Sequence, residues 1–250
     1  MSNRKVIVHP NDDLLAKATA NRLLLKLIDI QSVKRPIHLI ITGGTIGIKV
    51  LVEVKNSALL EAVDWSGVNF WWTDERFLPA GDGERNEVQA QEALLGTLAG
   101  LPKENIHRVA ASDAETDVEK AAELYTQELA KFAAEGDISP HFDIAIIGLG
   151  PDAHIASLFP DHEDLAKGKE NVGAISIHNS PKPPALRVSL TLSALANTAN
   201  VWFVAGGAGK AAAVSNSLSE SATFETTPGG VLFGSEETMW LIDLSAADFS

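Results

Sequence analysis

Residues 142–154 read Phe-Asp-Ile-Ala-Ile-Ile-Gly-Leu-Gly-Pro-Asp-Ala-His, and they carry the strongest signal for the fold. The apolar run Ile144–Ile147 is typical of a strand that is covered on both faces, as in a parallel sheet. Glycines follow this run at once, and the polar residues Asp152 and His154 come directly after them. Ligands bind at the carboxyl ends of the strands in an open parallel sheet. The stretch therefore predicts a parallel sheet with a candidate site at one edge.

Short apolar runs alternate with helical segments along all 250 residues, which is typical of a single α/β domain with a mainly parallel sheet. Asn11 is expected to cap a helix that runs to about Ile30, and Asn86 another that runs through Leu98. A third helix is predicted over Thr116–Ala134 from its apolar stripe. The predicted strands are Lys5–His9, Ile37–Thr42, Val68–Trp72, Asp143–Ile147, Ala174–Ile177, Asn200–Ala205 and Met239–Asp243.

Composition excludes several classes of protein. The net charge of −13 argues against nucleic acid or an anionic membrane as a partner, because both require a concentrated basic surface. The chain has no run of eighteen apolar residues and no secretion signal at its start, so a cytoplasmic location is expected. It has no cysteine, which rules out disulfides, thiolate metal sites and a cysteine nucleophile. An acidic protein that binds a phosphorylated ligand needs a few well-placed cations.

Three of the predicted strands end in glycine turns that lead into helices, and such turns let the backbone approach an anion closely. The first turn also has the spacing of a nucleophile elbow, with Thr45 in place of serine. The second fits the glycine pattern of dinucleotide folds, but the next strand lacks the acidic residue that binds a ribose, and nicotinamide chemistry remains an alternative. The turns contain Gly43, Gly44 and Thr45; Gly148 and Gly150; and Gly206, Gly207 and Lys210.

Several side chains next to these turns could carry chemistry. A carboxylate two residues from an imidazole can orient it, so His154 is a candidate base with Asp152 as its partner. Asp74 and Arg76 follow the strand Val68–Trp72, and a proline-rich loop leads to Arg187; either arginine could bind a phosphate or carboxylate. A metal site would need a third ligand, and His162 lies beyond Pro160 in a charged loop. No metal is therefore expected.

Taken together, these motifs closely resemble the 6-phosphogluconolactonase family, in the family's order and from about Val6 to Asp243. The resemblance covers the first glycine turn, the segment 72–76 with residues 85–86, the stretch 142–160, the loop 180–192 and the turn 206–211. It implies a single-domain three-layer α/β/α fold similar to that of glucosamine-6-phosphate deaminase. It also implies the hydrolysis of 6-phospho-D-glucono-1,5-lactone, without cofactor or metal. A monomer is expected.

The resemblance suggests roles for the candidate residues. His154 is expected to act as the general base, aligned by Asp152, with Arg187 stabilising the oxyanion. The turn residues Gly148 and Gly150, together with Asp74, are further candidates for the site. The substrate phosphate is expected to bind Gly43, Gly44, Thr45, Arg76 and Lys210.

Two other functions are compatible with these motifs, and the sequence departs from the family pattern at two positions. Deaminases of the same superfamily carry a glutamate five residues after the histidine, where this chain has Phe159, and an aromatic residue in place of Arg76. A non-catalytic sugar-phosphate-binding protein is the second rival. The family usually has proline at the position of Ile46 and glycine at that of Ala153, so Ala153 would be strained if its φ were positive.

Overall fold

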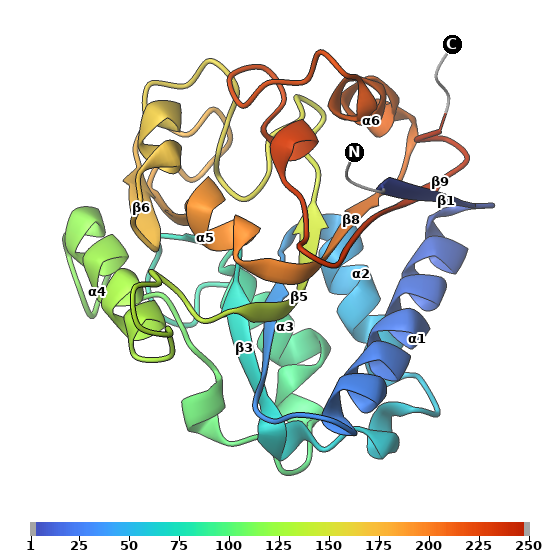
Figure 1. Ribbon diagram of the computed structural model, residues 1–250. Helices are drawn as coiled ribbons and strands as arrows, with labels where there is room; N and C mark the ends of the chain where they lie inside the picture. The colour runs from blue at the N-terminus through green and yellow to red at the C-terminus, as the bar shows by residue number, and fades with distance from the viewer. Residues whose placement is uncertain (1–3, 248–250) are drawn as a thin grey trace.

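A computed structural model describes residues 4–247. Its main sheet has six strands, all parallel, in the order β1-β9-β8-β5-β2-β3 (Figure 1). The predicted α/β fold with a mainly parallel sheet is confirmed. The strands of this sheet are β1 (Arg4–His9), β2 (Ile37–Ile41), β3 (Val68–Trp72), β5 (Phe142–Gly148), β8 (Thr198–Ala205) and β9 (Glu237–Asp243).

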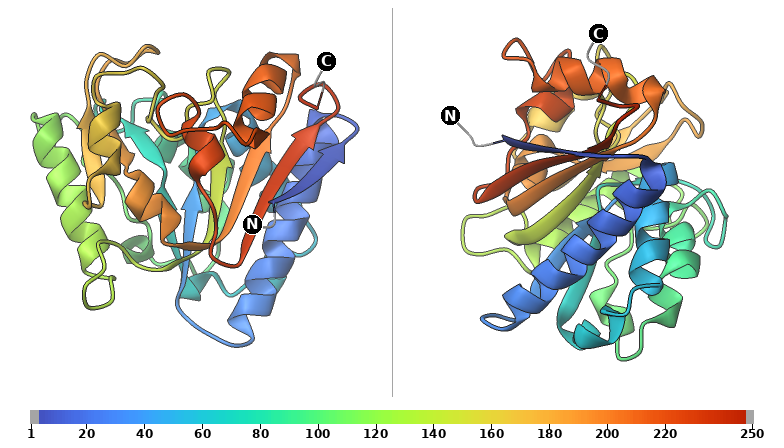
Figure 2. Two further views of the ribbon diagram at one scale, coloured as in Figure 1. Left: turned by 45° about the horizontal axis from the view of Figure 1, so that its top comes forward. Right: turned by 90° about the vertical axis from the view of Figure 1, so that its right-hand side faces the viewer.

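Both faces of the sheet are covered, which gives three layers (Figure 2). One face packs against α1 (Asp12–Gln31), α2 (Gly44–Lys55) and α3 (Asn86–Ala93). The other face packs against α4 (Val118–Ala130), α5 (Leu192–Ala196), α6 (Ala211–Leu218) and a small second sheet. Because both faces are buried, every residue of β2, β3 and β8 is buried, which explains their unbroken apolar runs.

The small sheet corrects the expected topology. It is antiparallel, in the order β4-β7-β6, and consists of β4 (Asp74–Arg76), β6 (Ala174–Ile177) and β7 (Arg187–Leu190). The predicted strand Ala174–Ile177 is correct in extent but belongs to this sheet. The other two strands were not predicted. The strand β4 consists of three charged residues, and the alternation of polar and apolar residues in β7 extends over only four positions.

The helices differ from the prediction mainly at their ends. Asn11 caps α1 as expected, and its Oδ1 accepts a hydrogen bond from Leu14 N at 2.9 Å. Asn86 is the first residue of α3 and not its cap, because its Nδ2 donates to Asp74 O at 2.8 Å instead. The helix also ends early, at Ala93. Over residues 4–247, none of the helices has the length and apolar character that crossing a bilayer would require.

The strand order brings the three glycine turns together. From β2 the chain goes on to β3 at one side of the sheet, whereas from β5 it goes on to β8 and β9 at the other side. The neighbouring strands β2 and β5 therefore flank a topological switch point. A switch point opens a crevice at the carboxyl ends of the strands. Since β8 is the other neighbour of β5, the turns that follow β2, β5 and β8 meet at one edge. The three glycine turns therefore converge on one site.

Candidate active site

A cavity of about 480 Å³ opens where the three turns meet. Of the residues predicted for the site, only Asp152 does not line it. Among the remaining lining residues, five carry polar side chains that were not assigned to the site from the sequence: Asp12, Thr42, Lys49, Asn86 and Lys182. The predicted residues on its wall are Gly43, Gly44, Thr45, Asp74, Arg76, Gly148, Gly150, His154, Arg187 and Lys210.

His154 and Asp152 form a hydrogen-bonded pair at the edge of the cavity. His154 Nδ1 lies 2.5 Å from Asp152 Oδ1, whereas Nε2 makes no hydrogen bond to the residues that the structure describes. Burial opposes ionisation of Asp152, but the hydrogen bond and the charges of His154 and Lys182 outweigh it and lower the pKa of the carboxyl. The imidazole also packs against Phe159, with ring centroids 4.4 Å apart. Nε2 is therefore free to bind a water or a substrate.

Gly150 makes this pair possible. A Cβ atom on Gly150 would lie 2.0 Å from His154 Nδ1 and 2.4 Å from Asp152 Oδ1. The pair thus folds back over the turn, and Gly150 N donates to His154 O at 2.9 Å. Only glycine leaves room for it.

Ala153 links the two residues of the pair and has the positive φ, 65°, at which the family's glycine would be unstrained. A left-handed conformation costs an L-residue about 1–2 kcal/mol, whereas glycine loses about 0.5–1 kcal/mol through its greater freedom in the unfolded chain. We therefore expect Ala153→Gly to raise the free energy of unfolding by about 0.5–1 kcal/mol, measured by urea denaturation. Ala121→Gly in α4 is the control and should destabilise; equal losses in both variants would contradict the strain at Ala153.

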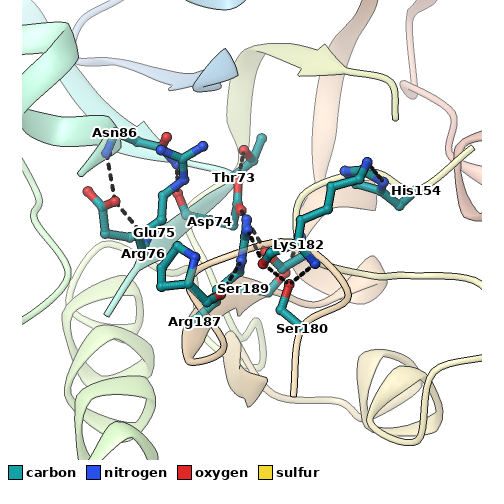
Figure 3. A network of polar contacts seen from close by, with 12 residues as sticks. Thr73, Asp74, Glu75, Arg76, Asn86, His154, Ser180, Lys182, Arg187 and Ser189 are labelled. Atoms are coloured by element: carbon teal, nitrogen blue, oxygen red, sulfur yellow. Dashed lines mark hydrogen bonds and ion pairs between the residues drawn. The ribbon is translucent and has the colours of Figure 1, made fainter. Parts of the chain in front are cut away.

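The small sheet places two arginines side by side at the cavity. Arg76 and Arg187 are directly opposite each other in the antiparallel pair β4–β7, so both side chains leave the same face (Figure 3). Two adjacent cations are unfavourable by themselves. Their pairing here is consistent with a site for an anion.

Arg187 is held in place by the proline-rich loop and by Asp74. Its Nη2 donates to the carbonyl oxygens of Lys182 at 2.9 Å and Pro183 at 3.0 Å. Its Nη1 lies 3.7 Å from Asp74 Oδ2, which also accepts a 2.6 Å hydrogen bond from Ser157 Oγ. Burial lowers the pKa of Arg187, and the charge of Asp74 partly offsets this effect. Asp74 therefore positions Arg187 at the cavity wall.

Arg76 is less completely bound. Its guanidinium donates to Glu84 O and lies 3.8 Å from the Glu84 carboxylate, but its buried Nε has no partner among the described residues. An unpaired buried donor is costly, and an acidic ligand would remove that cost. Arg76 N donates at 2.7 Å to Glu75, whose carboxylate also accepts from Asn86 N and Glu87 N at the start of α3. Burial raises the pKa of Glu75 to about 7, against the effect of Arg85 and of these N–H groups.

The first glycine turn lies at the opening of α2. Gly44 has φ 77°, and a Cβ on Gly43 would overlap Asn86 Oδ1, only 1.9 Å away. Asn86 thus connects the turn to Asp74, to which its Nδ2 donates. This packing leaves the start of α2, with Thr45, facing the cavity, where free N–H groups favour an anion.

Lys210 reaches the cavity from the third turn, and its Nζ donates to Leu149 O at 2.6 Å. Burial lowers its pKa, as does the nearby charge of Lys182, whereas Asp152 acts in the opposite direction. The ammonium is thus partly desolvated before any ligand binds. Such a cation interacts more strongly with a phosphate than a lysine on the surface does.

Local geometry does not favour the alternative readings of these motifs. His154 contacts Asp152 and Lys182 rather than Thr45, so Thr45 is not paired with this base in the described part of the chain. His162 Nε2 lies 3.2 Å from Asn179 O, and its Nδ1 accepts from Asp164 N. Within residues 4–247, no three His, Asp or Glu side chains are grouped as a metal site.

Comparison with known proteins places the chain in a family. The family model described as glucosamine-6-phosphate isomerases/6-phosphogluconolactonase matches residues 10–240. The chain is also 42% identical to a 6-phosphogluconolactonase of Streptomyces coelicolor, over 97% of this chain and 93% of the relative. The chain belongs to this family. The resemblance inferred from the motifs is confirmed.

Solved structures of the glucosamine-6-phosphate isomerase/6-phosphogluconolactonase family share the fold. A 6-phosphogluconolactonase of Thermotoga maritima superposes with a TM-score of 0.82 at 25% identity, over 96% of this chain and all of the other. A monomeric glucosamine-6-phosphate deaminase superposes with a TM-score of 0.79 at 15% identity, over 98% and 100% of the two chains. The likeness to the deaminase extends to the fold alone, so the side chains of the cavity must distinguish the two activities.

Proposed function

We propose that the protein hydrolyses 6-phospho-D-glucono-1,5-lactone to 6-phosphogluconate, the second step of the oxidative pentose phosphate pathway. The observation that carries the proposal is the free Nε2 of the Asp152–His154 pair in the same cavity as Arg76, Arg187 and Lys210. A substrate with an ester group and a phosphate suits this cavity, because the base can act on the ester while the cations bind the phosphate. The relatives named 6-phosphogluconolactonase support the same substrate.

In the proposed reaction, His154 Nε2 takes a proton from a water molecule, whose oxygen attacks the lactone carbonyl. Asp152 accepts the hydrogen bond from Nδ1, so it selects the tautomer that leaves Nε2 unprotonated. The lowered pKa of Asp152 keeps this carboxylate charged over the range in which histidine titrates. The same carboxylate stabilises the imidazolium that forms.

The carbonyl oxygen becomes negatively charged when water adds, and Arg187 is placed to stabilise it. Its guanidinium is fixed by the loop carbonyls and Asp74 before substrate arrives, so little reorganisation is needed. Backbone N–H groups of the turn Gly148–Gly150 are proposed as further donors, apart from Gly150 N, which donates to His154 O. The intermediate collapses when the bond from the carbonyl carbon to the ring oxygen breaks, and His154 returns its proton to that oxygen.

The phosphate is proposed to bind at the start of α2, between Arg76 and Lys210, with Gly43, Gly44 and Thr45 supplying the turn. The unpaired Nε of Arg76 and the partly desolvated ammonium of Lys210 support this position. Concentrating these cations in one cavity also overcomes the overall charge of −13, which would otherwise repel a phosphorylated substrate. Binding the remote phosphate orients the carbonyl towards the water.

The residue at position 159 favours hydrolysis over deamination. Deaminases of this superfamily carry a glutamate at this position, whereas here the phenyl ring of Phe159 packs on the imidazole of His154. A phenyl group cannot transfer a proton, so the relay that an isomerising deaminase needs is missing. We further propose that the protein acts as a monomer in the cytoplasm.

The proposed function is tested by the rate on freshly generated 6-phosphogluconolactone, after subtraction of spontaneous hydrolysis. We expect saturable hydrolysis that is unchanged after exhaustive chelation, because the proposed base is an imidazole that acts on water without a metal. Binding of 6-phosphogluconate without acceleration would indicate a non-catalytic sugar-phosphate-binding protein. Loss of activity with chelator would contradict the metal-independent mechanism.

A further inference from the structure

Lys182 contacts both members of the Asp152–His154 pair. Its Nζ lies 3.4 Å from His154 Nδ1 (Figure 3). The same atom lies 3.6 Å from Asp152 Oδ1. The side chain is 40% exposed and lines the cavity. Its ammonium is therefore a third charge at the proposed base.

The loop that carries Lys182 is held rigidly. Ser180 Oγ donates to Lys182 O at 2.9 Å, and the same carbonyl accepts from Arg187 Nη2, also at 2.9 Å. Pro181, Pro183 and Pro184 restrict the loop further. The backbone of Lys182 thus fixes Arg187, while its side chain reaches the opposite catalytic group.

The charges around His154 explain what this ammonium does. Asp152 favours the imidazolium, which cannot take a proton from water. The positive charges of Lys182 and Lys210, which line the same cavity, oppose protonation of the His154 imidazole. Arg187 acts in the same direction from the other side of Phe159, whose ring centroid lies 5.8 Å from the guanidinium carbon. His162 lies on the far side of that ring, at a centroid distance of 6.0 Å. Among the cationic side chains of residues 4–247, Lys182 is the one in direct contact with the pair.

We propose that Lys182 is a positioning residue that keeps His154 in its neutral, proton-accepting form by sharing the carboxylate of Asp152. The inference rests on the proposed lactonase function. Without the ammonium, the carboxylate would act on the imidazole alone and favour its protonation. When the ammonium of Lys182 is present, the Asp152 carboxylate still orients the imidazole. The positive charge of the ammonium then offsets the tendency of the carboxylate to favour the imidazolium.

The test is the pH dependence of kcat/KM in Lys182→Met, which removes the ammonium and keeps the loop carbonyl that binds Arg187. The charge of Lys182 is half-exposed, so its interaction with the imidazole is that of a water-like dielectric at this distance. Removing it should therefore shift the acidic limb of the pH profile to higher pH by about one unit. At pH values below that limb, kcat/KM of the variant should be about tenfold lower than that of the unmodified protein at the same pH. By pH 9 the two values should be equal. Lys182→Arg should restore the limb, and KM should change little in either variant.

The control is Lys167→Met, because Lys167 is similarly exposed (45%) and pairs with Asp164, outside the cavity. An NMR titration of the His154 ring in the free protein should show the same displacement for Lys182→Met, whether or not the lactonase assay succeeds. A large rise in KM with an unmoved limb would overturn the proposal in favour of phosphate binding. An equal loss of activity at all pH values with an unmoved titration would reduce Lys182 to a structural role.

Discussion

Replacing His154 by alanine is expected to lower kcat by about 10²–10⁴-fold, the usual contribution of a general base, and to change KM by no more than about threefold. The imidazole is proposed to act on water and not to bind the phosphate, so its loss affects the chemical step. Steady-state kinetics on fresh lactone, with the spontaneous rate subtracted, measures both constants. The fall in kcat should persist at every pH, unlike that of Lys182→Met.

His141→Ala is the matched control for this variant. His141 is exposed, bonds to Asn197 Oδ1 at 3.0 Å and does not line the cavity. Its replacement should leave both constants unchanged. If His154→Ala kept its kcat and lost affinity instead, the imidazole would be a binding group, and the base would have to be sought elsewhere.

Replacing Lys210 by methionine is expected to raise KM by about 10- to 100-fold and to change kcat much less. A hydrogen bond to a charged group contributes about 1.5–3 kcal/mol, and here the ammonium is partly desolvated. Because the phosphate keeps its charge throughout the reaction, the contact is made equally in the ground and transition states. Lys103→Met removes the same charge from an exposed position and should leave KM unchanged.

The same variant makes a second, independent measurement possible. Burial lowers the pKa of Lys210, so folding carries a desolvation cost for this group at pH values below its pKa in the unfolded chain. Lys210→Met should therefore keep or raise the free energy of unfolding. A variant that loses both affinity and stability would show that Lys210 is structural through its bond to Leu149 O.

Much of the fold could be predicted from the sequence because the signals are local. All seven predicted strands exist, and the continuous apolar run in β5 correctly indicated a strand covered on both faces. Asp152 and His154 are two residues apart, so their pairing depends only on the turn between them. The sequence comparison indicated strain at Ala153 only if its φ were positive, and the structure gives it a φ of 65°.

The contacts that build the site are between distant segments, and the sequence could not reveal them. Whether Arg76 lies opposite Arg187 depends on the register of β4 against β7, and both strands are too short to be recognised from the sequence. The bonds from Ser157 to Asp74 and from Asn86 to Asp74 join residues 83 and 12 positions apart. Asn86 was therefore interpreted as a helix cap, although its amide supports the first glycine turn.

The sequence by itself determined that this is a parallel α/β protein of one family, and which turns and charged residues are its candidates for chemistry. These properties follow from apolar periodicity, glycine turns and residue spacing, which act over a few positions of the chain. Only the tertiary structure decided that Lys182 touches the Asp152–His154 pair and that Asp74 positions Arg187. The reason is that long-range packing and strand register set these contacts, and neither leaves a local pattern in the chain.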